Sequence, residues 1–162
     1  FSFFRMRPTN FPTIRMAQLV ALYHQHENLF SKIIKTQKLI EIYKLFSVPI
    51  TTFWQTHYTF EKSSKKSLKK ITRSFVDLLI INTIIPLKFL YQKRRGEVRE
   101  NELVSLIKQI HPEKNTIISG FSNLQIKSEN AFDTQALLEL KNEYCTSKRC
   151  VLCAIGNQLL RR

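Results

Sequence analysis

The feature that most constrains the fold is a helical repeat of apolar residues along most of the chain. The first such stretch places four apolar residues at i, i+3, i+4 and i+7: Met16, Leu19, Val20 and Tyr23. No stretch of useful length alternates between apolar and polar residues, as a half-buried strand would. Only three glycines occur in 162 residues, which argues against a turn-rich β-sandwich. We therefore predict an all-α fold, a single compact multi-helix domain with short connections over residues 1–162.

Further helices are expected wherever the repeat returns. The apolar residues that mark them are Phe30, Ile33 and Ile34; Leu39, Ile42, Tyr43 and Phe46; Leu103, Leu106, Ile107 and Ile110; Leu137, Leu140 and Tyr144; and Leu152, Ile155 and Leu159. Asn115 and Asp133 are expected to cap the helices that follow them. Residues 51–60 are either a short helix or an extended aromatic stretch, and the lysine-rich residues 61–70 are interpreted as a mobile loop.

The most apolar stretch, residues 76–91, is predicted to lie inside a long helix from about Arg73 to about Arg95. Pro86 is expected to kink this helix, and Gly96 to end it. Because polar residues interrupt the apolar run and it is short for a bilayer, we interpret it as a core helix and expect no membrane partner.

The chain carries 26 Lys and Arg against 12 Asp and Glu, a formal net charge of +14. Such an excess favours polyanionic partners, namely DNA or RNA, anionic lipid or an acidic protein surface. The alternatives are a solvated basic surface, or a face that packs on an acidic domain or on a second copy of the chain as a homodimer.

A basic, proline-braced segment, RMRPTNFPTIR, precedes the first predicted helix. Arg5, Arg7 and Arg15 place three guanidinium groups around a helix N-terminus, an arrangement suited to phosphate or carboxylate. The lysines predicted to contact nucleic-acid phosphate with them are Lys65, Lys66, Lys69 and Lys70. In the alternative interpretation, the arginines clamp backbone carbonyls or a buried acid such as Asp77.

All three cysteines lie within nine positions near the C-terminal end: Cys145, Cys150 and Cys153. If Cys150 begins the last helix, Cys150 and Cys153 share one face and can meet one zinc ion or an iron–sulfur cluster. A fourth ligand would have to be a histidine, from among His24, His26, His57 and His111, or come from elsewhere. Alternatively, the cysteines are small apolar residues at a helix start. Their odd number and crowding argue against a disulfide framework and favour a reducing, cytoplasmic setting.

The aromatic segment around Trp54, His57 and Tyr58 lies beside the lysine-rich stretch, where it could stack on nucleobases or form part of the core. No Gly-rich phosphate loop, H-E-x-x-H, G-x-S-x-G or nuclease-like acid pair occurs. The sequence therefore holds no complete active site, and no catalytic residue is assigned.

Four motifs carry a family resemblance: RMRPTNFPTIRMAQL, FWQTHYTF, IINTIIP and YCTSKRCVLCAIG, in this order. Together they resemble the C-terminal half of an uncharacterised bacterial family, a domain of unknown function. The resemblance implies a longer parent protein whose N-terminal half is similar to restriction-endonuclease-like nucleases. It makes that half the expected partner, and this chain a helical accessory domain, a C-terminal fragment without an initiator Met.

Overall fold

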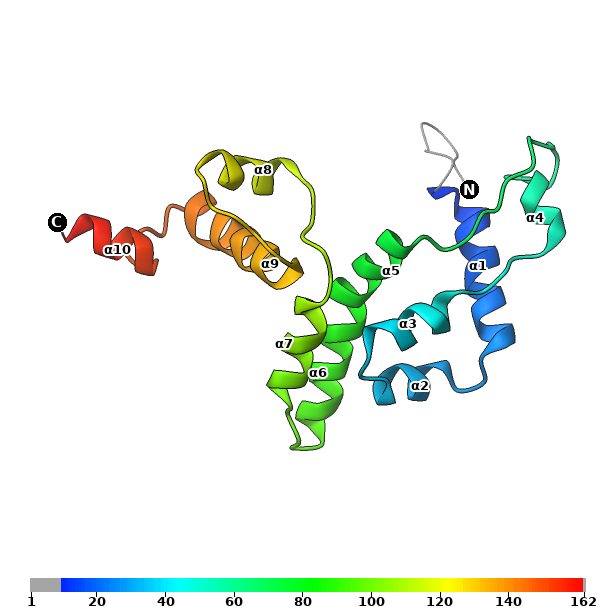
Figure 1. Cartoon of the computed structure of the whole chain (residues 1–162), viewed down its shortest axis with the longest axis horizontal. Coiled ribbons are helices and arrows are strands. Elements are labelled where there is room, and N and C mark those ends of the chain that lie inside the picture. Colours follow the sequence, from blue (N-terminus) through cyan, green and yellow to red (C-terminus); the bar gives the residue numbers. More distant parts are fainter. Residues whose placement is uncertain (1–9, 162) are drawn as a thin grey trace. The chain divides into compact units, whose positions relative to one another are not determined.

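The computed structural model describes residues 10–161, and every regular element in them is a helix (Figure 1), which confirms the all-α prediction. The α-helices are α1 (Pro12–Gln25), α2 (Leu29–Lys35), α3 (Leu39–Phe46), α4 (Thr52–Thr56), α5 (Arg73–Leu79), α6 (Ile85–Arg94), α7 (Glu100–Lys108), α8 (Thr116–Asn123), α9 (Ala131–Glu139) and α10 (Ala154–Leu160). Two π-helical turns accompany them, η2 (Ile80–Ile84) and η3 (Leu140–Thr146).

The chain divides into two compact units, Phe1–Lys88 and Phe89–Arg162, which we call the N-terminal unit and the C-terminal unit. The division falls inside α6. This division describes only how the chain packs, so it does not test whether residues 1–162 form a single domain, which stays a prediction.

The N-terminal unit is built around apolar side chains from α1, α3 and the helix that begins at Arg73. Ile14, Ile42 and Ile80 are at most 2% exposed. On α3 the expected stripe is confirmed, because Leu39, Ile42 and Phe46 are buried. Pro49 lies three residues after the end of α3, outside the helix, because a helix interior could not accommodate a proline.

On α1 the expected stripe faces the wrong way. Met16 and Leu19 are 51% and 53% exposed, and Val20 and Tyr23 are each 66% exposed. The buried residues of this helix are Thr13, Ile14, Gln18 and Leu22. The predicted stripe is wrong because Gln18, a polar residue, lies on the buried face. Its side-chain amide is hydrogen-bonded to Arg15 and to the carbonyl of Lys69, so this face can be buried.

A continuous helix from Arg73 to Arg94 comprises α5, η2 and α6. Proline has no N–H to continue the helical ladder, and the π-helical turn η2 lies just before Pro86 and takes up the irregularity. Gly96 follows with φ +71°, the left-handed conformation typical of a residue after a helix end. The expected stop at Gly96 is therefore confirmed, whereas the kink at Pro86 stays a prediction.

The same helix is 22 residues long with a mean hydropathy of 1.5 over its most apolar stretch, enough to cross a membrane by length and composition. A core helix passes the same test. Val76, Ile80 and Ile84 are buried, but only 28% of the apolar stretch is, so the interpretation as a core helix stays a prediction.

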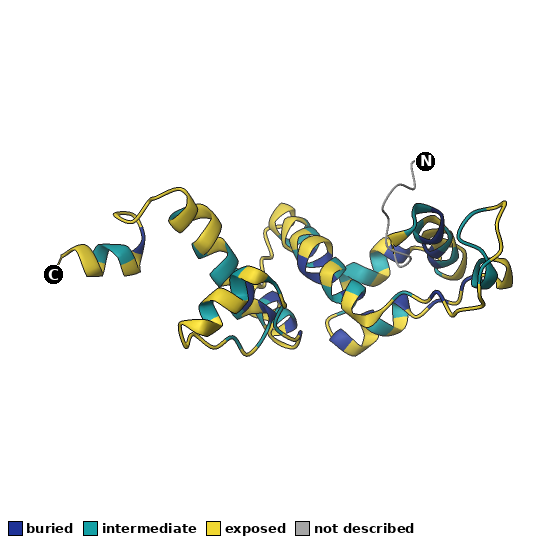
Figure 2. Ribbon diagram, turned by 90° about the horizontal axis from the view of Figure 1, so that it is seen from above, coloured by how far each residue is buried: buried dark blue, intermediate teal, exposed yellow. Residues whose placement is uncertain are grey.

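The C-terminal unit packs α7 and α8 against α9. Leu103, Leu106 and Ile110 are buried, as the sequence predicted, and the N–H of Ala131 donates to the carbonyl of Ile110 at 2.9 Å. By contrast, α10 is exposed along nearly its whole length (Figure 2).

Of the two helix caps predicted in this unit, one is confirmed and the other is wrong. Asn115 caps α8, as predicted, by accepting a hydrogen bond from the N–H of Ile118 at 3.0 Å. The predicted cap Asp133 lies inside α9; Asn130 caps this helix instead, accepting from the N–H of Asp133 at 3.1 Å. Asp133 in turn accepts from the N–H of Glu129, so both side chains satisfy backbone donors at this helix start.

Candidate nucleic-acid interface

Arg15 lies on the first turns of α1 and is held in one orientation by its neighbours. Its two terminal nitrogens donate to Gln18 at 2.9 Å and to Asn10 at 3.0 Å. The guanidinium lies 3.5 Å from the centroid of the Phe75 ring. Partial burial lowers the pKa of Arg15, but an arginine starts so high that it stays charged at neutral pH. None of these contacts is to a carboxylate, so the positive charge is not neutralised by them.

Lys69, in contrast, is turned inward. Its Nζ donates to the carbonyl of Trp54 at 2.6 Å and to that of His57 at 2.9 Å, and it lies 3.9 Å from the centroid of the Tyr58 ring. Burial lowers the pKa of this ammonium group. Lys69 therefore ties α4 to the segment that follows it, and its charge points away from solvent.

A hollow of about 510 Å³, which we call the Arg15 pocket, brings several of the predicted residues together. Arg15 lines it from α1, and Lys69 and Lys70 line it from the lysine-rich stretch. Hydroxyl-bearing residues at and before the start of α5 complete the polar side: Ser67, Thr72 and Ser74. Because the ammonium group of Lys69 is bonded to carbonyls, Arg15 and Lys70 are the cations left to the pocket, and with the hydroxyl groups they are suited to an oxyanion.

The remaining predicted lysines, Lys65 and Lys66, are fully on the surface. Their segment is a loop, as the sequence suggested, and its backbone is bonded to α4. The N–H of Ser64 donates to the carbonyl of Thr56 at 2.6 Å, and the N–H of Ser67 to that of Gln55 at 2.9 Å. Arg5 and Arg7 lie outside the described residues.

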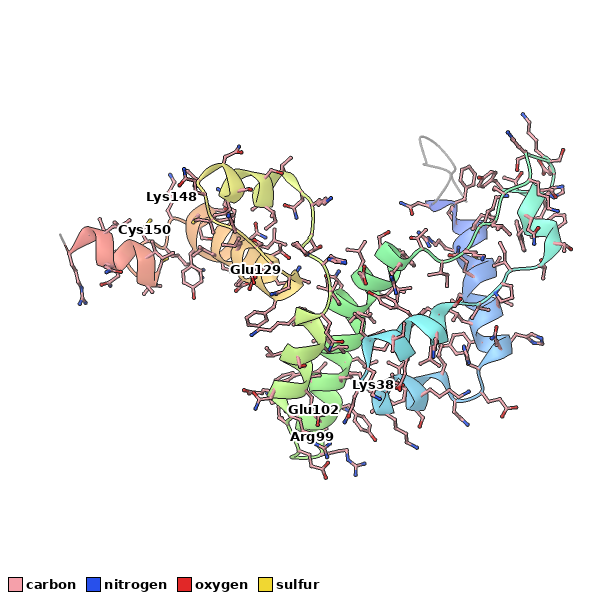
Figure 3. The ribbon with its side chains drawn as sticks, viewed as in Figure 1. Lys38, Arg99, Glu102, Glu129, Lys148 and Cys150 are labelled. Carbon is pink, nitrogen blue, oxygen red and sulfur yellow. The ribbon has the colours of Figure 1, made fainter. Side chains whose placement is uncertain are left out.

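Charge is distributed unevenly between the two units. The N-terminal unit contains 14 of the 26 Lys and Arg but only 4 of the 12 Asp and Glu. Among the described residues, both ion pairs belong to the C-terminal unit and join Arg99 to Glu97 at 4.0 Å and to Glu102 at 3.4 Å (Figure 3). Because its cationic side chains outnumber its acidic ones by ten, this unit needs counter-ions from its surroundings.

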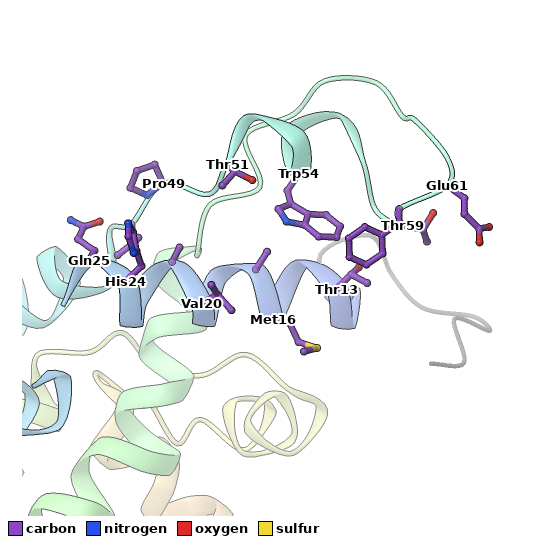
Figure 4. A pocket seen from close by; sticks show the side chains of 14 residues that line it. Thr13, Met16, Val20, His24, Gln25, Pro49, Thr51, Trp54, Thr59 and Glu61 are labelled. Atoms are coloured by element: carbon purple, nitrogen blue, oxygen red, sulfur yellow. The ribbon is translucent and has the colours of Figure 1, made fainter. Parts of the chain in front are cut away.

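A second hollow, which we call the Trp54 groove, lies between α1 and the segment 48–61, with a volume of about 1000 Å³. Its walls are mostly apolar, with Met16 and Val20 on the α1 side and Trp54 and Phe60 on the other. Figure 4 shows the indole of Trp54 pointing from α4 toward α1. The aromatic segment is thus neither fully core nor fully solvated: it forms one wall of an open groove.

The cysteines do not assemble in the way the metal hypothesis requires. Cys145 and Cys150 are exposed and Cys153 is buried. Cys150 and Cys153 do not share a helical face, because α10 begins only at Ala154 and Cys150 lies in the preceding turn beside Lys148 (Figure 3). In residues 10–161 no three His, Cys, Asp or Glu side chains are grouped to hold an ion. Zinc or an iron–sulfur cluster on these cysteines stays a prediction, which metal analysis of freshly purified protein would check.

The structure also identifies residues that the sequence did not suggest. Asn10 and Gln18 orient Arg15, and Phe60 forms part of the Trp54 groove. Hydropathy could not predict that Gln18 is buried, because a glutamine is buried only where its amide finds hydrogen-bond partners, and these are known only from the structure. An exposed Phe60 beside a lysine run, however, is a signal that sequence reading can use.

Comparison with curated proteins gives no match, and comparison with solved structures gives none either. Residues 1–116 match the family described as "Protein of unknown function (DUF2851)". These residues include the RMRPTNFPTIRMAQL motif but not the cysteine motif. The match covers the N-terminal unit and α7, well over half of the chain. The chain therefore belongs to this uncharacterised family of proteins of unknown function.

Proposed function

We propose that the chain is a basic helical accessory domain that binds nucleic-acid phosphate through its N-terminal unit. The observation that carries the proposal is the excess of positive charge in the N-terminal unit, of which Arg15 and the five lysines of residues 61–70 lie at the Arg15 pocket and the adjoining lysine-rich segment. A surface of this kind attracts a polyanion by releasing its counter-ions, whatever its sequence.

The contacts would divide into two classes. Arg15, held by Asn10 and Gln18, would present a fixed, charged fork to one phosphate at the pocket. Lys65, Lys66 and Lys70 are exposed and would track the neighbouring phosphates. Lys69 acts differently, as the residue that positions this segment against α4.

The proposal places the domain beside a nuclease-like half of the same protein, which would carry the chemistry. That part rests on the motif resemblance alone, because the family that the chain matches is one of unknown function, and family membership does not by itself supply an activity. The binding function can be tested on the chain alone.

The test is fluorescence anisotropy with labelled single-stranded and duplex oligonucleotides between 50 and 300 mM KCl. Affinity is expected to fall steeply with salt, because each phosphate contacted contributes about one unit to the slope of log affinity against log salt. The double change Lys65→Gln with Lys66→Gln should lower the slope by about 2. The matched control, Lys141→Gln with Lys148→Gln in the C-terminal unit, should leave it unchanged.

Two results would overturn the proposal. One is the absence of binding to either oligonucleotide at 50 mM KCl. The other is an equal loss from both pairs of substitutions, which would show a diffuse effect of net charge rather than a site on the N-terminal unit.

A second candidate function, a protein-interaction domain, is favoured by the exposed apolar stripe of α1. Met16, Leu19, Val20 and Tyr23 are each at least half exposed, an unusual amount of apolar surface for one helix face. Such a surface is typical of interfaces, with the proposed nuclease-like half or a second copy of the chain as the occupant. Its test is the oligomeric state, argued in the Discussion.

A further inference from the structure

The Trp54 groove has the size and composition of a ligand site, and nothing so far assigns it a ligand. Its volume of about 1000 Å³ lies at the upper end of the range for small-molecule pockets. The surface of the groove is mostly apolar, although polar side chains also line it: Thr13, His24, Gln25, Thr51, Thr59 and Glu61. A ligand held here must therefore present flat or apolar faces rather than a pattern of hydrogen-bonding edges.

The aromatic wall of the groove is unusually exposed. Phe60 is 74% exposed, and its ring lies 5.1 Å from that of Trp54 in an edge-to-face arrangement. Behind them, Phe53 lies 5.0 Å from Trp54 and stacks on His57 at 4.1 Å with the planes 5° apart. The stack supports Trp54 and Phe60 from one side and leaves ring surface open to the groove.

Positive charge adjoins this wall. Residues 61–70 follow Phe60 directly and contain five lysines against one glutamate. Because Ser64 and Ser67 are bonded to the backbone of α4, the lysines are held in register with the helix that carries Trp54. Aromatic faces beside a fixed cationic track are the combination by which proteins bind single-stranded nucleic acid.

From these contacts we infer that the Trp54 groove takes unpaired nucleobases of single-stranded nucleic acid, while the neighbouring lysines hold its phosphates. The inference rests on the proposed function and gives it a substrate class. A duplex cannot serve, because its base faces are stacked on one another and only their edges reach the grooves. Since the surface of the Trp54 groove is mostly apolar and would contact base faces, binding should depend little on sequence.

The chain contains one tryptophan, so its fluorescence reports on this groove alone. We would titrate the protein at 50 mM KCl with a 15-nucleotide oligo-dT, a 15-nucleotide oligo-U and a 15-base-pair duplex. The single strands should quench Trp54 and the duplex should not. The DNA and RNA arms then show which backbone is preferred.

Substitution separates the groove from the charge. Phe60→Ala should weaken single-strand binding about tenfold, the order expected for one lost stacking contact, and change duplex binding less than about twofold. Because Phe60 is largely exposed, this variant should keep its fold, which circular dichroism would verify. Phe30→Ala is the control: it removes an exposed aromatic ring of α2 that neither lines the groove nor belongs to the α1 stripe, and should change neither.

The outcomes distinguish the two proposals. Equal binding of single strand and duplex without quenching would overturn the groove inference and leave phosphate binding intact. If poly-glutamate quenches Trp54 fluorescence as strongly as oligo-dT does, the groove inference is also overturned, and the groove would instead bind an acidic protein. No binding of any nucleic acid would overturn both.

Discussion

At the scale of single residues, the N-terminal unit depends on polar side chains that hydropathy would place at the surface. Gln18 is 4% exposed and donates to the carbonyl of Lys69 at 3.0 Å, while Lys69 itself donates to two carbonyls of the α4 segment. A chain of this kind links α1, the lysine-rich segment and α4. Each of these hydrogen bonds should stabilise the fold, because without it a carbonyl inside the unit would lose its partner.

Lys69→Met should therefore destabilise the protein by about 2 kcal/mol and loosen the segment that carries Trp54. Denaturant unfolding measures the first effect, and a red shift of Trp54 emission the second. Lys66→Met, at an exposed position nearby, should stay within about 0.5 kcal/mol of the natural protein. Unchanged stability and emission in Lys69→Met would mean that the carbonyls find water instead.

Tyr43 gives the molecule a pH dependence of its own. Its hydroxyl donates to Asp77, and burial, followed by this hydrogen bond and the nearby carboxylate charge, raises the pKa of Tyr43 far above its usual range. The folded state therefore keeps the phenol proton after the unfolded chain loses it. The resulting stability is present below about pH 10 and is lost as the pH rises above that value.

Tyr43→Phe removes this dependence. Between pH 9 and 11.5, the urea midpoint of the natural protein should fall more steeply than that of the variant. The lysines titrate alike in both proteins and cancel in the comparison. A steeper fall in the variant would contradict the assignment.

At the scale of the elements, the sequence predicted where helices lie better than which way they face. The α3 and α7 stripes are correct because one face of each is plainly apolar. On α1 either of two faces could be buried by its apolar residues, and the hydrogen bonds of Gln18 determine which face is buried. Caps show the same limit: Asn130 and Asp133 are both good caps, and only the backbone geometry selects Asn130.

The candidate site was predictable to a similar degree. Arg15, Lys69 and Lys70 were predicted to contact phosphate together; they line one pocket, and the contact with phosphate stays a prediction. Their division of labour was not predictable, since charge alone cannot show that Lys69 bonds to backbone carbonyls inside the unit. The last helix was expected to carry Leu152, but its start is delayed to Ala154 by the turn through Cys150.

Gly156 explains how that turn and α10 fit together. A Cβ at this position would lie 2.4 Å from the backbone oxygen of Cys150, a distance that real contacts do not reach. Only glycine lets the turn approach the helix so closely. At Gly120, on α8, a Cβ would meet nothing within 4 Å.

Gly156→Ala should therefore displace the turn and expose Cys153, whereas Gly120→Ala should be neutral or stabilise its helix by up to about 1 kcal/mol. Thiol titration reads this out: the natural protein should show two fast thiols, Cys145 and Cys150, and one slow thiol. In Gly156→Ala the third should react about tenfold faster, because the opening that exposes it costs less free energy. A third thiol that stays slow would refute this role for Gly156.

At the scale of the whole molecule, two tendencies oppose each other. A net charge of +14 keeps copies of the chain apart, while the exposed stripe of α1 offers apolar surface for them to share. Repulsion between surface charges acts over about 10 Å at 0.1 M salt and only about 3 Å at 1 M, whereas apolar contact is not weakened by salt. The balance should therefore move with ionic strength in the direction opposite to nucleic-acid binding.

We expect a monomer of 19.2 kDa at 50 mM NaCl and a larger weight-average mass at 1 M NaCl, measured by light scattering after size exclusion. Leu19→Lys, in the middle of the stripe, should keep the protein monomeric at both salt concentrations, because the added ammonium group would have to be desolvated in the contact. Ile40→Lys is the matched control, since Ile40 is similarly exposed but lies on α3. If both substitutions prevent association equally, the contact is non-specific and the stripe is not its site; if only Leu19→Lys does, the α1 stripe is an interface of the folded chain.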